Sequence, residues 1–148
     1  MVLTAFLDAN VLLSAATRSV LLELARKKTY RLLWSDREHD EWMRNLAARF
    51  PQIPPAKIAR MRVLMEAYVN DATVPDYEPL IATLSLPDPD DRHVLAAAVH
   101  GGASIIVTSN LRDFPNAALA IHGITATTPD SFALHPCWSS IARACSKR

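Results

Sequence analysis

The stretch that decides the fold is LPDPDDRHVLAAAVHGGASIIVTSNLRDF, at residues 86–114. Asp88 is a favourable N-cap residue and Pro89 suits the first position of a helix, so the pattern predicts a helix that ends at the glycine pair beginning with Gly101. The run SIIVT at 104–108 is typical of a strand buried on both faces. A helix followed at once by a buried strand is the repeating unit of α/β proteins.

The same alternation continues along the rest of the chain. Apolar runs at 2–7 and 31–34 predict two more strands, and residues 120–127 predict a last one. Helical patterns occupy the segments between them, at 11–13 with 19–26, at 35–50, at 55–68 and from about residue 138 onward. Strands that alternate with helices favour an α/β fold whose sheet is largely parallel.

Composition favours an ordinary globular protein. The 148 residues are 50% hydrophobic and 21% charged, which fits one domain over residues 1–148 and excludes a disordered or coiled-coil chain. No apolar run is long enough to cross a membrane, and the N-terminus lacks the basic segment of a signal peptide. On a helix, Cys137 and Cys145 would lie about 12 Å apart, too far to form a disulfide. We therefore expect a cytoplasmic protein.

Charge is distributed unevenly along the chain. Residues 1–70 hold 11 basic and 7 acidic side chains, whereas residues 71–130 hold 2 basic and 8 acidic ones. A basic half beside an acidic cluster suits a polyanion that is held by arginine and processed over metal ions. The alternative is that the basic triplet 26–28 is simply a solvated helix end.

Acidic residues stand where buried parallel strands are expected to end. Asp8 closes the first apolar run, with Asn10 two residues on, and Asp113 follows the run SIIVT within the polar loop TSNLRDF. The carboxyl ends of parallel strands form the ligand crevice of open sheets. Each acid also has a local interpretation, Asp8 as a helix N-cap and Asp113 as an ordinary loop residue.

The acids at the start of the helix after residue 88 are of two kinds. Asp88 and Asp90 are explained by the helix N-terminus, which favours negative charge. Asp91 shares the inward stripe with Leu95 and Ala98, so its carboxylate needs a partner, for which a metal ion is one candidate.

The helix at 35–50 carries four more acids, and three of them are candidates for the site. Ser35 and Glu38 form a capping-box pattern, and Glu41 lies beside the apolar stripe that begins at Trp42. Periodicity does not choose among Glu38, Asp40 and Glu41, and Glu41 has the alternative of an ion pair with Arg37.

Converging carboxylates with little histidine favour a hard, oxygen-liganded ion such as Mg²⁺ or Mn²⁺. His93 and His100 are expected to be ordinary surface or boundary residues. With only three glycines, the chain has no phosphate-binding glycine-rich loop.

Several segments together resemble the PIN-domain nucleases of the VapC type, the toxins of bacterial toxin–antitoxin pairs. They are FLDANVLLSA at 6–15, LLWSDREHDEW at 32–42, the stretch 86–114 and TPDSF at 128–132. The resemblance implies a three-layer α/β/α sandwich with a parallel sheet and an acidic pocket that holds Mg²⁺ or Mn²⁺. It also implies a homodimer and a small antitoxin that covers the pocket.

The resemblance assigns roles to individual residues. Asp8, Glu41, Asp91 and Asp113 match the family's catalytic acids, and Asp8, Asp91 and Asp113 would hold the metal. Supporting roles fall to Asn10, Asp88, Thr108, Ser109 and Asn110, the last standing where many relatives carry Asp. Arg92 and Arg112 would contact RNA.

The hypothesis is therefore a metal-dependent endoribonuclease that leaves a 5′-phosphate. The alternative is a PIN fold without catalytic activity that serves as an RNA-binding or assembly module. A phosphotransfer enzyme with Asp8 as nucleophile is disfavoured, because the second Asp expected two residues later is Asn10.

Overall fold

The computed structural model describes residues 2–134. Its four strands form one parallel sheet in the order β2-β1-β3-β4. The strands are β1 (Thr4–Leu7), β2 (Arg31–Leu33), β3 (Ile105–Val107) and β4 (Thr125–Thr127). The predicted fold class, an α/β sandwich with a parallel sheet, is confirmed.

Seven α-helices and four short 3₁₀ helices connect and flank the strands in the described part of the chain. The α-helices are α1 (Ala15–Arg26), α2 (Asp36–Arg49), α3 (Pro55–Tyr68), α4 (Glu78–Ile81), α5 (Arg92–His100), α6 (Asn116–Leu119) and α7 (Pro129–Ala133). The 3₁₀ helices are η1 (Ala9–Leu12), η2 (Pro89–Asp91), η3 (Leu111–Asp113) and η4 (Ala120–His122).

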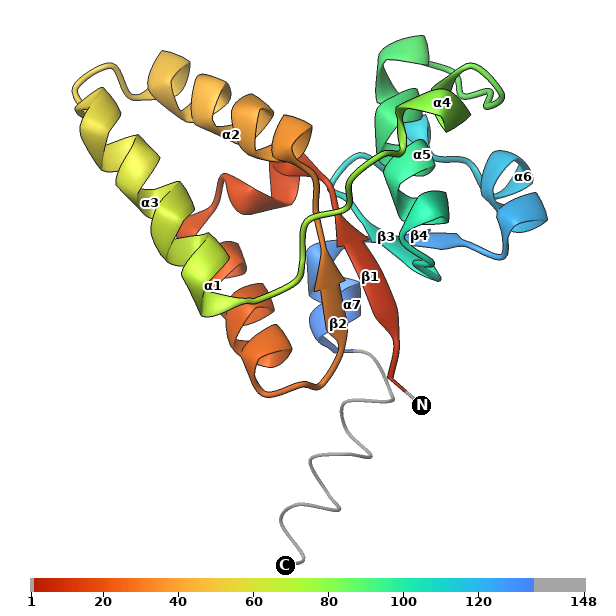
Figure 1. Cartoon of the computed structure of the whole chain (residues 1–148), viewed down its shortest axis with the longest axis horizontal. Helices are drawn as coiled ribbons and strands as arrows, with labels where there is room; N and C mark the ends of the chain where they lie inside the picture. The colour runs from red at the N-terminus through yellow and green to blue at the C-terminus, as the bar shows by residue number, and fades with distance from the viewer. Residues whose placement is uncertain (1, 135–148) are drawn as a thin grey trace, which may run out of the picture.

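The helices lie in two layers, one on each face of the sheet (Figure 1). Alternate residues of β1 point to opposite faces, so Ala5 and Leu7 join the core against α1, α2, α3 and α7, whereas Phe6 joins the core against α5 and α6. Because successive side chains of a strand point to opposite faces, a strand whose two faces are both covered by helices is apolar throughout. The three-layer arrangement follows directly from it.

Local sequence explains most element boundaries. Ser35 caps α2 and accepts a hydrogen bond from the Glu38 backbone N–H, and Asp88 caps η2, which leads directly into α5. Gly101 ends α5, as predicted. Trp34, which follows β2, forms a single parallel bridge with Thr73.

The start of the last strand was predicted wrongly. This strand begins at Thr125 rather than at residue 120, because residues 120–122 form η4 and Gly123 then adopts a left-handed φ of +70°. Phe50, the C-cap of α2, is exposed, and so is Leu64 on α3, while Met65 is buried. The predicted helix from residue 138 and both cysteines lie outside the described residues.

Within residues 2–134, no helix has the length and apolar character that crossing a bilayer requires.

Candidate functional site

The crevice at the carboxyl ends of β1 and β3 is the natural ligand position of this sheet. Chain order reverses there, because β2 lies on one side of β1 and β3 on the other. Such a switch point leaves space that no crossover helix covers. Asp8 directly follows β1 and Thr108 directly follows β3, so both lie at this point.

Asp8 is held firmly in place. Its Oδ1 accepts a hydrogen bond from the Ala9 backbone N–H at 2.8 Å, which is the N-cap interaction, and its Oδ2 accepts from the Thr108 hydroxyl at 2.9 Å and from the Asn10 amide at 3.1 Å. The side chain of Asp8 therefore caps η1 and also lies at the carboxyl end of β1, so the structure is compatible with both its local and its functional interpretation.

The helix α2 contributes two acids to the same place. Glu38 is fully buried, and its Oε2 accepts from the Ala9 N–H at 2.9 Å, the donor that Asp8 also uses. Glu41, half-buried and one helical turn further on, lies close enough to act electrostatically on both Asp8 and Glu38. Asp40 is on the other side of α2, where it pairs with Arg62 at 3.1 Å. It is thereby separated from Glu38 and Glu41.

Asp91 and Asp113 complete the group from the opposite helix layer and the loop after β3. Asp91 lies at the start of α5, with its Oδ2 buried and without a hydrogen-bond partner. The strongest charge acting on it is that of Asp113, followed by Asp8 and Asp88. Asp113 accepts a hydrogen bond from the side-chain amide of Asn110.

In the described residues, no lysine or arginine forms an ion pair with these carboxyl groups. Among the described residues, no Lys or Arg nitrogen lies within 4.0 Å of the carboxylates of Asp8, Glu38, Glu41, Asp91 or Asp113. Burial, with the charge of Glu38 next, raises the pKa of Asp8 to about 7. Burial also raises the pKa of Glu38 to about 8 and that of Asp91 to about 6. An uncompensated buried carboxylate is unfavourable unless a cation joins it.

The surrounding residues organise the crevice. Thr108 also accepts hydrogen bonds from the Asn110 backbone N–H at 3.0 Å and from the Asn10 amide at 3.3 Å, and Asn10 Oδ1 accepts from the Ser109 N–H at 3.1 Å. Asp88 accepts from the Asp90 N–H at 2.9 Å and so caps η2. One network therefore links the loops after β1 and β3.

The donor set fits a hard divalent ion. Asp8, Asp91 and Asp113 offer carboxylate oxygens, which Mg²⁺ and Mn²⁺ prefer, and the Oδ2 of Asp91 is buried without a hydrogen-bond partner. In the described residues, however, the ligand atoms that lie within 4.8 Å of one another are those of Glu38, Glu41 and His93, not those of the three aspartates. The family model of the PIN domain matches residues 4–112, from β1 into η3, and so includes every acid described above except Asp113. The chain belongs to the PIN-domain family.

A short stretch of the chain is also similar to a curated relative. This PIN-domain chain is 57% identical over 44 residues to a protein of Mycobacterium tuberculosis named "Putative ribonuclease VapC50". The match covers 30% of this chain and 26% of that relative, so the chain spans about a quarter of the length of the curated protein it matches. The similarity to VapC-type PIN proteins predicted from the sequence is confirmed.

His93 was predicted wrongly. It is 5% exposed, and its Nδ1 lies 3.0 Å from Glu38 Oε1 at the edge of the acidic crevice of this PIN domain. The apolar spacing of α5 contained the signal, since His93 is followed at once by the buried run from Val94 to Ala98. Glu38 had been explained as half of a capping box, but its carboxylate turns away from the helix start toward Ala9 and His93.

The two candidate RNA contacts lie near the crevice without entering it. Arg92 donates from Nε to the Pro89 carbonyl at 3.1 Å, and Arg112 is exposed on η3 beside Asp113.

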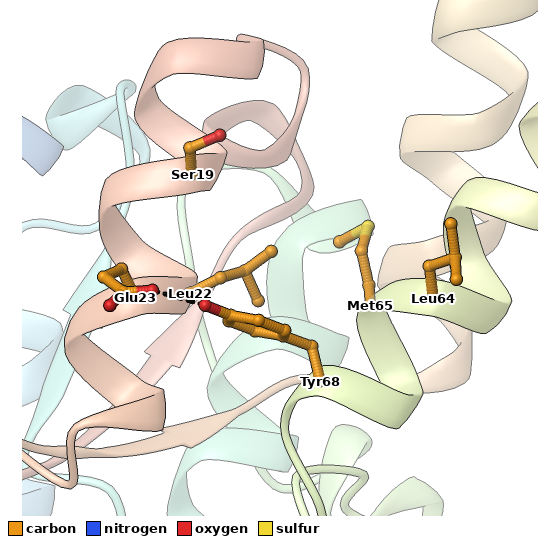
Figure 2. Close-up of a pocket in the computed structure, with 6 residues that line it drawn as sticks. All are labelled: Ser19, Leu22, Glu23, Leu64, Met65 and Tyr68. Atoms are coloured by element: carbon orange, nitrogen blue, oxygen red, sulfur yellow. Dashed lines mark hydrogen bonds between the residues drawn. The ribbon is translucent and has the colours of Figure 1, made fainter.

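A separate hollow of about 320 Å³ lies between α1 and α3 of the PIN domain (Figure 2). It is mainly apolar, and its acid, Glu23, accepts a hydrogen bond from the Tyr68 hydroxyl. Its lining residues are Ser19, Leu22, Glu23, Leu64, Met65 and Tyr68. None of these belongs to the carboxylate group at the end of the sheet.

Proposed function

We propose that this PIN-domain protein is a metal-dependent endoribonuclease, the toxin of a toxin–antitoxin pair. One observation carries the proposal: acids from four separate segments gather at the switch point of the sheet, and in the described residues no Lys or Arg nitrogen lies within 4.0 Å of their carboxylates. Asp8, Glu41, Asp91 and Asp113 would be the catalytic acids. The resemblance to a VapC-type relative supports RNA as the substrate.

Asp8, Asp91 and Asp113 would hold Mg²⁺ or Mn²⁺. When bound, such an ion lowers the pKa of a coordinated water and offsets charge on the phosphodiester. Thr108 and Asn10 fix the Oδ2 of Asp8 through hydrogen bonds, and Asn110 orients Asp113. Fixed ligands keep the reacting groups aligned, which is where most of the protein's contribution to such catalysis lies.

The remaining residues would act around this centre. Glu41, which is half-buried, would take up a proton from an attacking water. Ser109 and Asp88 would support the loops on either side. Arg92 and Arg112 would hold the RNA backbone, because guanidinium groups contact phosphate through paired hydrogen bonds.

A small antitoxin protein and a second copy of the chain are the proposed partners, both on the family resemblance. We also propose that residues 1–148 act as one PIN domain in the cytoplasm.

The decisive experiment is a metal titration against a labelled RNA. Wild-type protein should cleave in Mg²⁺ or Mn²⁺ and leave a 5′-phosphate, and chelation should abolish cleavage. Asp91→Asn and Asp8→Ala should lower the rate by at least about 100-fold, since each removes a ligand or a positioning acid. Asp90→Asn is the matched control, because Asp90 is exposed and its side chain has no contact in the crevice.

The result can also overturn the proposal. If pure wild-type protein binds RNA without cleaving it in either metal, the chain is a binding or assembly module. If Asp90→Asn loses as much activity as Asp91→Asn, charge at the helix start rather than ligation explains the effect.

A further inference from the structure

Glu38 and His93 meet in an arrangement that hydrogen bonding does not explain. Glu38 Oε1 and His93 Nδ1 lie 3.0 Å apart, and both atoms are buried without a geometrically acceptable hydrogen-bond partner. The two side chains are 0% and 6% exposed. They come from the first turns of α2 and α5, which face each other across the end of β1.

The other interactions of Glu38 leave Oε1 available. Its Oε2 already accepts the Ala9 N–H at 2.9 Å, and the α2 N-terminus is capped by Ser35. A neutral imidazole nitrogen without a proton is an acceptor, as is a carboxylate oxygen. When the Glu38 carboxylate is ionised and His93 Nδ1 carries no proton, two buried acceptors face each other, and this arrangement is costly unless a proton or a metal cation lies between them.

Glu41 supplies a third ligand on the solvent side. One ligand atom each of Glu38, Glu41 and His93 lies within 4.8 Å of the others. Two atoms that are each about 2.1 Å from one ion lie about 3.0 Å apart at a right angle and about 3.4 Å apart at the tetrahedral angle. The Glu38–His93 separation therefore already fits a coordination sphere, and half-buried Glu41 can close on it by changing its rotamer.

We propose that Glu38, Glu41 and His93 form a second metal site, selective for a borderline divalent cation such as Zn²⁺. The site differs from the Asp8, Asp91 and Asp113 set in its ligands, because it contains a nitrogen donor, but it shares Glu41 with the proposed catalytic acids. Imidazole with carboxylate suits Zn²⁺ and its neighbours in the transition series, whereas Mg²⁺ prefers oxygen ligands only. Three protein ligands would leave a fourth position open toward the crevice.

The test measures binding and requires no RNA. Metal-free protein, with Cys137 and Cys145 replaced by serine so that thiols do not contribute, is titrated calorimetrically with Zn²⁺ in excess Mg²⁺. We expect one equivalent of Zn²⁺ to bind despite the Mg²⁺. Co²⁺, used as a spectroscopic probe, should give visible bands that Zn²⁺ abolishes. Since cleavage is not measured, failure here is distinguishable from failure of the proposed nuclease activity.

Two variants and a control locate the ion. His93→Gln should weaken Zn²⁺ binding by at least about tenfold, as even outer-shell changes cost about 10–100-fold. His100→Gln, at the exposed end of the same helix, should bind like wild type. Glu38→Gln should also lose Zn²⁺ yet melt at a higher temperature without metal, because its amide can accept from Ala9 and donate to His93 Nδ1.

Two outcomes overturn the site. Either wild-type protein binds no Zn²⁺ in excess Mg²⁺, so that only a proton lies between Glu38 and His93, or folded Glu38→Gln and His93→Gln retain wild-type affinity.

Discussion

The carboxylates of Asp8 and Glu38 share one hydrogen-bond donor, the backbone N–H of Ala9, at 2.8 and 2.9 Å. The two residues lie at the end of β1 and in the first turn of α2, so the contact joins a strand to a helix 30 positions further along the chain. Asp8 also accepts from the Thr108 hydroxyl and the Asn10 amide, but these neutral donors do not offset two buried negative charges. The fold therefore carries a local electrostatic cost at this point.

That cost predicts how the stability of the metal-free protein depends on pH. Burial raises the pKa of Asp8 from 3.8 to about 7 and that of Glu38 from 4.5 to about 8. The folded state then binds more protons than the unfolded state, so stability is full at low pH and is lost as the pH rises through the folded pKa values. We expect the free energy of unfolding in EDTA to fall from pH 6.5 to pH 8.

The range from pH 6.5 to pH 8 separates the effect of the acids from that of the buried histidines. The histidines change the free energy of unfolding in the opposite direction, and only below pH 6.5. Burial lowers the pKa of His39 from 6.5 to about 4 and lowers that of His93, so their contribution is lost only as the pH falls below 6.5. Urea unfolding of Glu38→Gln should show a flatter pH dependence between 6.5 and 8, and exposed Asp40→Asn should follow wild type. A wild-type stability that is constant or rising over this range would contradict the prediction.

Divalent metal should offset the same repulsion. On the proposed function, Mg²⁺ at 100 times its dissociation constant stabilises the folded state by about 2.7 kcal/mol. For a chain of this size that is a rise in melting temperature of about 5–10 °C at pH 8. Differential scanning calorimetry with matched ionic strength checks it, and Asp91→Asn should show a much smaller rise. An equal rise in the variant would show that the ion binds elsewhere.

The hydrogen bonds of the Thr108 hydroxyl should contribute measurably to the free energy of unfolding. Its hydroxyl is fully buried, donates to Asp8 and accepts from the Asn110 N–H. Thr108→Val keeps the shape but leaves that N–H without its partner, so we expect a loss of roughly 1–3 kcal/mol. Thr108→Ser keeps the hydroxyl and should lose less in the same urea titration. If serine and valine are equally destabilising, packing of the methyl group outweighs the hydrogen bonds.

Substitution of Gly101 or Gly102, the two glycines after α5, by alanine should destabilise the fold for two different reasons. A Cβ at Gly101 would lie 2.7 Å from Leu33 Cδ1 and 2.9 Å from Val74 Cγ2, whereas Gly102 has open space but a φ of +77°. Gly101→Ala should cost about 1–3 kcal/mol through overpacking, and Gly102→Ala about 1–2 kcal/mol through backbone strain. In urea double-mutant cycles, Val74→Ala should partly relieve the first penalty and leave the second unchanged. Equal coupling at both positions would contradict this assignment.

Hydrophobic period and local capping made the fold predictable. The apolar runs of β1 and β3, Ser35 at the start of α2 and Gly101 at the end of α5 are signals read within a few residues. The start of β4 was predicted too early in the chain, because the turn at Gly123 and the short η4 have weaker local patterns than a regular helix or strand.

The sequence by itself determined that Asp8 and Asp113 follow buried strands and that Asp91 stands at the start of a helix, because strand ends and helix starts are encoded locally. It did not decide between Glu38, Asp40 and Glu41, since three acids within four residues of one helix differ only in direction. The tertiary structure decided that: α2 packs so that Asp40 faces Arg62, while Glu38 and Glu41 face β1 and His93. Side-chain direction across a helix contact depends on the partner layer, which no local pattern contains.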